Sequence, residues 1–260
     1  WQLCAHAGRD LRHSRDLLAR DLDALQAQAD GYSGVLKLQA AGPWTLAAGI
    51  ELHRGDKALA DPGAVRDLGQ SLTAGLAEHL ADVRRRVPGA RLLVQLDEPS
   101  LPAVLGGRIR TASGFERLPA VEESTVESSL SDVISGLDAP VAIHCCAGDP
   151  PIGLFRRAGA AAVAVDAALF KDEDAVGEVI DAGMLLFLGV VPGTDTGRVD
   201  AAQPARGLWH RLGFPPEDLA ARVVLTPSCG LAGATPGYAR QALTWCREAG
   251  RALVNSPEPD

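Results

Sequence analysis

The sequence predicts an α/β fold built from repeated strand–helix units. Six short apolar segments of strand length are separated by longer segments in which leucines recur at helical spacing. Most of the apolar segments are continuous and do not alternate with polar residues, which is typical of parallel strands covered on both faces. A chain of 260 residues is long enough for one large α/β domain.

The apolar runs define the predicted strands in chain order: Val35–Gln39, Leu92–Leu96, Pro140–His144, Ala162–Asp166, Met184–Gly189 and Val223–Thr226, with Trp1–Cys4 as a weaker seventh. Amphipathic patterns predict helices over Leu11–Ala29, Ala64–Arg86, Val126–Leu137, Glu173–Ala182 and Ala239–Arg251. Pro88-Gly89 is a stop signal after the second helix, and the Pro-rich residues 256–260 predict a frayed tail.

Two features favour a closed (β/α)8 barrel over an open sheet. No strand is followed by a Gly-rich nucleotide-binding loop. Polar residues follow several different strands, which is where barrel enzymes place their sites. A barrel needs eight strands and at most seven are recognisable, so we expect a single domain over 1–260 whose first strand is absent from this chain.

Composition restricts the class of partner and the compartment. The net charge is -8 and no long run of Lys or Arg occurs, which argues against nucleic acid. No apolar stretch of about 18 residues predicts a membrane span. Five cysteines, two of them adjacent, do not suggest a disulfide framework. A cytoplasmic location is predicted, where clustered cysteines are more often metal ligands or catalytic groups.

The most informative motif is His144-Cys145-Cys146 at the end of an apolar strand. Side chains alternate along a strand, so His144 and Cys146 point to one side and Cys145 to the other. An imidazole and a thiolate are good zinc ligands. Cys229 follows another strand and could supply a third ligand. The alternative is a buried histidine beside small core cysteines.

Carboxylates follow two further strands. Asp166 could be the fourth, oxygen ligand of the same ion, or it could cap the helix that follows. Asp97 and Glu98 are costly to bury without a cation or donors, and they could bind a substrate ammonium group. The alternative for Asp97 is that it caps a short helix with Pro99 at its start.

Several of these motifs occur together in the order found in one known family. They are Gly42-Pro43-Trp44-Thr45, Leu96-Asp97-Glu98-Pro99-Ser100-Leu101, His144-x-Cys146, Val165-Asp166 and Pro227-Ser228-Cys229-Gly230-Leu231. The set resembles the catalytic barrel of cobalamin-independent methionine synthase, especially the short single-domain bacterial members, over about residues 34 to 235. The resemblance implies a barrel of the methionine synthase/uroporphyrinogen decarboxylase-like type.

The resemblance also implies roles for individual residues. Zinc would be held by His144, Cys146, Asp166 and Cys229, and Asp97 would bind the amino group of homocysteine. The family usually has Glu where this chain has Asp166. A family histidine after the seventh strand has no counterpart in residues 189–195. The family strand that helps to hold homocysteine would precede Trp1, and the N-terminal half that helps to hold folate is absent.

The sequence therefore predicts a zinc-dependent methyltransferase that activates a thiol, most simply homocysteine, for attack on a methyl donor. The donor could be a methylated folate or a methylcorrinoid, since the folate-binding half is missing. One alternative is an enzyme similar to uroporphyrinogen decarboxylase, which would need arginines at the barrel mouth and no zinc. Another is a degenerate barrel that binds metal or ligand without turnover. The oligomeric state is not predicted.

Overall fold

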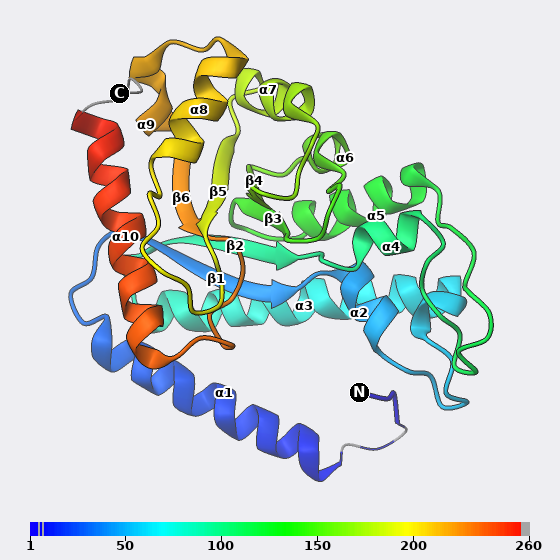
Figure 1. Ribbon diagram of the computed structural model, residues 1–260. Coiled ribbons are helices and arrows are strands. Elements are labelled where there is room, and N and C mark those ends of the chain that lie inside the picture. The colour runs from blue at the N-terminus through cyan, green and yellow to red at the C-terminus, as the bar shows by residue number, and fades with distance from the viewer. Residues whose placement is uncertain (5, 7, 256–260) are drawn as a thin grey trace. The chain divides into compact units, whose positions relative to one another are not determined.

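The computed structural model describes residues 1–4, 6 and 8–255 (Figure 1), so the predicted frayed tail lies outside the described residues. All six main strand predictions are confirmed, with ends displaced by at most two residues: β1 (Val35–Ala41), β2 (Arg91–Asp97), β3 (Val141–Cys145), β4 (Ala162–Asp166), β5 (Leu185–Val191) and β6 (Val223–Pro227). Strands β2 to β5 are mostly buried, whereas β1 alternates between exposed and half-buried residues.

The predicted eight-stranded barrel is wrong. The described residues form a six-stranded sheet in the order β1-β2-β3-β4-β5-β6, which begins at β1 and ends at β6. Trp1–Cys4 is not a strand, because only Gln2 makes an isolated bridge, to Glu51. The polar strand ends that suggested closure are no evidence for it, since an open parallel sheet also places its site at the carboxyl ends of its strands.

The chain divides into two compact units. Unit 1 comprises Trp1–Leu96 and Ala103–Val141, and unit 2 comprises Asp97–Pro102 and Ala142–Asp260. The helices of unit 1 are α1 (Arg9–Gln28), α2 (Pro43–Gly49), α3 (Pro62–Arg86), α4 (Leu101–Leu105) and α5 (Glu123–Ser135), with a 3-10 turn at Ala58–Ala60. The first residues of α4 are assigned to unit 2.

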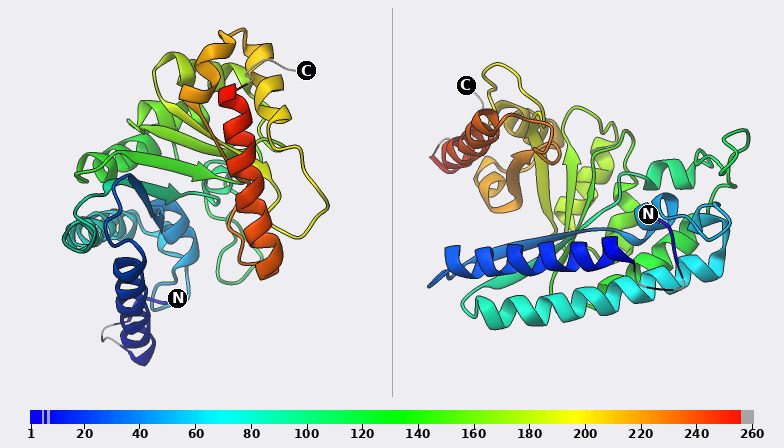
Figure 2. Two further views of the ribbon diagram at one scale, coloured as in Figure 1. Left: turned by 90° about the vertical axis from the view of Figure 1, so that its left-hand side faces the viewer. Right: turned by 90° about the horizontal axis from the view of Figure 1, so that it is seen from below.

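The core of unit 1 lies between its strands and the long helices α1, α3 and α5. It contains Leu22, Leu76, Leu80, Val83, Leu92, Val94, Leu96, Val133, Leu137 and Val141. Figure 2 shows α1 running alongside α3. Asp61 caps α3 by accepting hydrogen bonds from the N–H groups of Gly63 and Ala64, with Pro62 at the first helical position. The helix therefore begins two residues before the predicted start.

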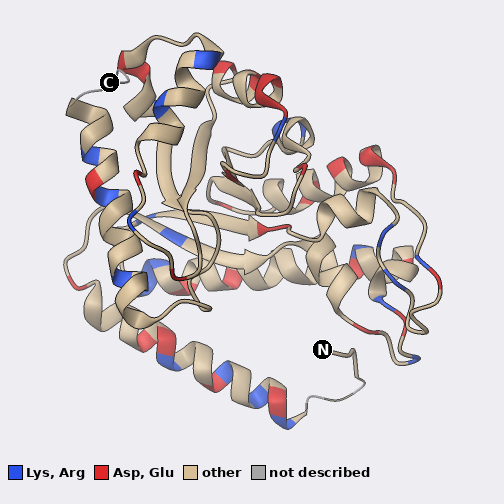
Figure 3. Cartoon of the chain, in the orientation of Figure 1, with Lys and Arg blue, Asp and Glu red and all other residues tan. Residues whose placement is uncertain are grey.

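The leucine pattern of α1 is only partly used for packing. Leu22 is buried, but Leu11, Leu17 and Leu18 are exposed. Figure 3 shows acidic and basic residues mixed along α1. One of its acids, Asp23, pairs with Arg86 of α3 at 2.8 Å. No helix among the described residues has both the length and the apolar character needed to span a membrane.

Unit 2 carries the candidate site. Its strands pair in parallel, with Ala142 opposite Ala162, Ala162 opposite Leu185 and Leu186 opposite Val223. The helices that follow are α6 (Ile152–Arg157), α7 (Glu173–Asp181), α8 (Gln203–Leu212), α9 (Leu219–Arg222) and α10 (Pro236–Asn255), with a 3-10 turn at Pro216–Asp218. Helices α7 and α8 pack on β5, and α10 packs on β6. This leaves the carboxyl ends of the strands to the loops.

Replacing the buried Leu80 with alanine should lower the free energy of unfolding by about 2–5 kcal/mol, because a cavity remains in the core of unit 1. Leu11→Ala is the matched control on an exposed helical face and should change this free energy by less than about 0.5 kcal/mol. Urea unfolding monitored by circular dichroism measures both. Equal losses in the two variants would contradict the assignment of the core.

Candidate metal centre

Three side chains of unit 2 converge at the carboxyl ends of its strands. One ligand atom each from His144, Cys146 and Cys229 lies within 4.8 Å of the others. His144 and Cys146 come from the end of β3, and Cys229 comes from the segment after β6. The sequence predicted these three ligands, and their atoms are close enough together to bind one metal ion.

His144 is oriented by the neighbouring strand. Its register partner on β4 is Ala164, and its Nδ1 lies 3.2 Å from the Ala164 carbonyl oxygen. A carbonyl can only accept a hydrogen bond, so Nδ1 must carry the proton and donate it. The neutral ring then has its lone pair on Nε2, the nitrogen that would bind a metal. A backbone carbonyl is a common partner for the second nitrogen of a metal-binding histidine.

The two cysteines lie close enough to interact directly. The Sγ atoms of Cys229 and Cys146 share a hydrogen bond of 3.4 Å, and neither residue is in a disulfide. Burial, then the hydrogen bond with Cys229, raises the pKa of Cys146 to about 12. A second negative sulfur is therefore unfavourable here without a cation. A divalent ion would remove that penalty, which is the physical fit between this pair and a metal.

Cys145 lies on the other side of β3, as the alternation of strand side chains predicted. It is completely buried, and burial raises its pKa to about 11, with a smaller contribution from the charge of Glu98. Its Sγ is outside the group of three candidate ligand atoms, because the side chain points into the core. Cys145 therefore belongs to the core of unit 2.

Asp166 has the backbone position of a fourth ligand, but one of its carboxylate oxygens is engaged in a backbone turn. It ends β4 two residues after Ala164, so it shares the sheet face of His144. Its Oδ1 accepts a hydrogen bond of 2.9 Å from the Ala168 N–H. The residue closes a turn and does not cap the next helix, which begins at Glu173 with Asp172 as its cap. It is outside the group of three ligand atoms.

The acidic pair lies beside the end of β3. The Glu98 N–H donates to the His144 carbonyl oxygen at 2.7 Å, which fixes residues 97–98 next to this candidate metal ligand. Asp97 is half-buried, whereas Glu98 is completely buried. The following helix begins at Leu101 and not at Pro99. Of the two predicted substrate-binding acids, Asp97 is therefore the one open to a ligand; binding by either stays a prediction.

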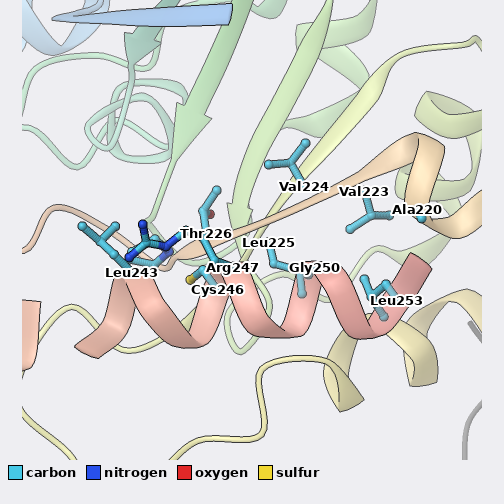
Figure 4. Close-up of a pocket in the computed structure, with 11 residues that line it drawn as sticks. Ala220, Val223, Val224, Leu225, Thr226, Leu243, Cys246, Arg247, Gly250 and Leu253 are labelled. Atoms are coloured by element: carbon cyan, nitrogen blue, oxygen red, sulfur yellow. The ribbon is translucent and has the colours of Figure 1, made fainter. Parts of the chain in front are cut away.

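A cavity of about 530 Å³ lies elsewhere in unit 2, between β6 and α10 (Figure 4). Its walls are mostly apolar, and it is lined by Ala220, Val223, Val224, Leu225, Thr226, Pro227, Leu243, Cys246, Arg247, Gly250 and Leu253. None of the three candidate metal ligands lines it. It is a gap in the packing of α10 on β6, and it does not form part of the metal centre.

Asp195 and Thr235 make an interaction that was not predicted from the sequence. The Thr235 N–H and hydroxyl donate to the two carboxylate oxygens of Asp195, at 2.8 and 2.7 Å. These bonds hold the pKa of Asp195 below its usual value. The sequence did contain a signal for Thr235, because Thr-Pro is typical of a helix cap followed by the first helical residue. The predicted helix start at Ala239 is three residues late.

Comparisons with known proteins leave the function open. No protein-family model matches the sequence, and no curated protein matches it. A candidate lyase/mutase from Burkholderia cenocepacia J2315 is similar over 93% of this chain and 90% of its own, with 15% identity and a TM-score of 0.30. The carboxyl transferase domain of Rhizobium etli pyruvate carboxylase is similar over 93% of this chain and 53% of its own, with 15% identity and a TM-score of 0.29. Similarity this low carries no argument.

Metal binding should release protons. The raised pKa of Cys146, about 12, means that its thiol is protonated at neutral pH and must ionise to bind a metal ion. Affinity should therefore rise with pH, about tenfold per pH unit for each proton released. Zinc titration calorimetry at pH 7.5 in PIPES and in HEPES would measure the release, because the two buffers bind zinc weakly and take up protons with different heats. Identical heats in both buffers would contradict it.

Proposed function

We propose that this chain is a zinc-dependent enzyme that transfers a methyl group to a thiol, with homocysteine as the acceptor and methionine as the product. The observation that carries the proposal is the convergence of His144, Cys146 and Cys229 within 4.8 Å. The ordered motifs that resemble cobalamin-independent methionine synthase support it, because these three residues are the ones that match the family's histidine and cysteine ligands.

The chemistry of the donor set favours a thiol substrate over water. Two thiolates and a neutral imidazole already balance the charge of a divalent ion, so this donor set suits an electron-rich sulfur better than the generation of hydroxide. When bound, zinc would supply deprotonation of the substrate thiol at neutral pH. In the proposed transfer the new S–C bond forms as the bond from methyl carbon to donor breaks, and the bonding electrons leave with the donor.

The protein's own residues would hold the metal ion and orient its ligands. His144 is held by the Ala164 carbonyl, so its ring cannot rotate freely about the strand end. Asp166 lies on the same sheet face with its Oδ1 bound to the Ala168 N–H. We propose Asp166 as an exchangeable fourth ligand that gives way to the substrate. The shorter reach of Asp compared with Glu agrees with a weakly held position.

Asp97 is the proposed binding residue for the substrate ammonium group. Its half-buried position at the end of β2 and the bond from Glu98 to the His144 carbonyl support this role. A carboxylate there would pair with the amino group of homocysteine while the thiol is held at the metal centre. The methyl donor would be a methylated folate or a methylcorrinoid.

The protein purified without chelators should contain about one zinc ion per chain by mass spectrometry of the metal. Cys229→Ser should lose most of this zinc, because serine is a poor zinc ligand. Cys4→Ser is the matched control, since Cys4 is an exposed free cysteine outside the group, and it should keep the zinc. An absence of zinc from the parent protein would refute the proposed function.

Asp97→Asn should raise KM for homocysteine about tenfold or more, because a charge-assisted hydrogen bond to the ammonium group is lost. The same variant should use 4-mercaptobutyrate, which is homocysteine without its amino group, as well as the parent does. Mass spectrometry would follow methyl transfer from labelled methyltetrahydrofolate and, separately, from methylcobalamin. Zinc binding without transfer from either donor would favour the non-catalytic alternative. An equal loss with both thiols would contradict ammonium binding.

A further inference from the structure

The segment that carries Cys229 is neither a strand nor a helix, yet its first residue is hydrogen-bonded to the end of β5. It covers residues 228–235, between β6 and α10, and Cys229 is exposed. At its start, the Ser228 N–H donates to the Val191 carbonyl oxygen at 2.8 Å, which continues the pairing of β5 with β6 beyond the strand end. The residue before Cys229 is thereby tied to β5.

Two glycines allow the backbones around Cys229 to approach closely. A Cβ atom at Gly189 would lie 2.5 Å from Ser228 Cα, and one at Gly193 would lie 3.0 Å from the Gly230 carbonyl oxygen. The residues on both sides of Cys229 therefore pack against β5 and its extension, where a side chain would not fit. This packing explains the position of the segment but does not fasten its far end.

The far end is fastened by Asp195 and Thr235. Both carboxylate oxygens of Asp195 accept hydrogen bonds from Thr235, one from its N–H at 2.8 Å and one from its hydroxyl at 2.7 Å. The Thr235 hydroxyl also accepts from the Tyr238 N–H at 3.3 Å in the first turn of α10. Thr235 is thus linked to the helix and to the segment after β5 at once.

A second link runs parallel to the first. The hydroxyl of Tyr238, a buried residue of α10, donates to the Pro192 carbonyl oxygen at 3.0 Å. The segment 191–195 is therefore bound to both ends of the segment 228–235 and to the start of α10. A helix of 20 residues packed on β6 gives these links a rigid support.

We propose that Asp195 and Thr235 form a clamp that positions Cys229 beside Cys146 for metal binding. The inference rests on the metal centre of the proposed function. The two residues do not touch the metal; they act through the backbone on either side of the cysteine. An ordinary helix cap would need only Thr235, because its hydroxyl already accepts from the Tyr238 N–H. The carboxylate of Asp195 is not needed to cap the helix. Its two hydrogen bonds connect the segment 191–195 to the segment 228–235.

The test uses Asp195→Ala, which removes the link and leaves the Thr235 cap in place. Zinc affinity, measured in competition with a chromogenic chelator, should fall about ten- to a hundredfold, as for other residues that orient metal ligands. In the metal-free protein, cross-linking of the free thiols of Cys146 and Cys229 by a short bis-methanethiosulfonate reagent, from which each thiol displaces a methanesulfinate group, should fall as well. Thr235→Ser keeps the hydroxyl and should retain both properties, whereas Thr235→Val keeps only the N–H bond to Asp195 and should weaken both, less than Asp195→Ala does.

A second aspartate separates positioning from general stability. Asp172 caps α7 in the same unit through the Ala175 N–H, so Asp172→Ala should lower thermal stability without changing zinc affinity or cross-linking. The proposed role of the clamp is contradicted if the folded Asp195→Ala variant binds zinc and cross-links like the parent. It is also contradicted if Asp172→Ala reduces zinc affinity and cross-linking as strongly as Asp195→Ala does. If the parent binds no zinc, the proposed function and the metal role of the clamp fail together. Cross-linking then still decides whether the clamp holds Cys229.

Discussion

The parallel pairing of β3, β4, β5 and β6 is the constraint on which the candidate metal centre depends. Because the strands run in the same direction, their carboxyl ends meet at one edge, and the side chains that follow them come together. Pairing also sets orientation: the Ala164 carbonyl, held opposite His144, fixes which nitrogen of the imidazole carries the proton. A shift of one residue in the register of β3 would move His144 to the opposite face of the sheet.

Electrostatics explains why two neighbouring thiols favour the binding of a cation. Two thiols that share a hydrogen bond of 3.4 Å, one half-buried and one exposed, resist losing both protons, and the pKa of Cys146 is raised in part for this reason. The same closeness is favourable once a cation is present. The arrangement is therefore better suited to holding an ion than to holding two free thiols. Cys145, one residue away but on the buried face, takes no part.

The sequence predicted the strands well, and it singled out the three side chains that converge, because both depend on local patterns. Apolar runs locate buried strands, and alternation assigns His144 and Cys146 to one face. Closure of the sheet was predicted wrongly, since it depends on pairing between distant strands, which no local pattern reports. The turn of Asp166 toward the Ala168 N–H and the burial of Glu98 were also out of reach, because they follow from the conformation of single side chains. The Asp195–Thr235 link joins residues 40 positions apart.

The separation of the two cysteine ligands along the chain has a consequence for folding. Cys146 and Cys229 are 83 residues apart, so they meet only after β4, β5 and β6 have found their neighbours. Closing so long a loop is entropically unfavourable in the unfolded chain, which therefore offers an ion the local pair of His144 and Cys146 without Cys229. An ion would bind the assembled form selectively and shift the folding equilibrium toward it. Its uptake would mark the last stage of folding, after the order of the strands is fixed.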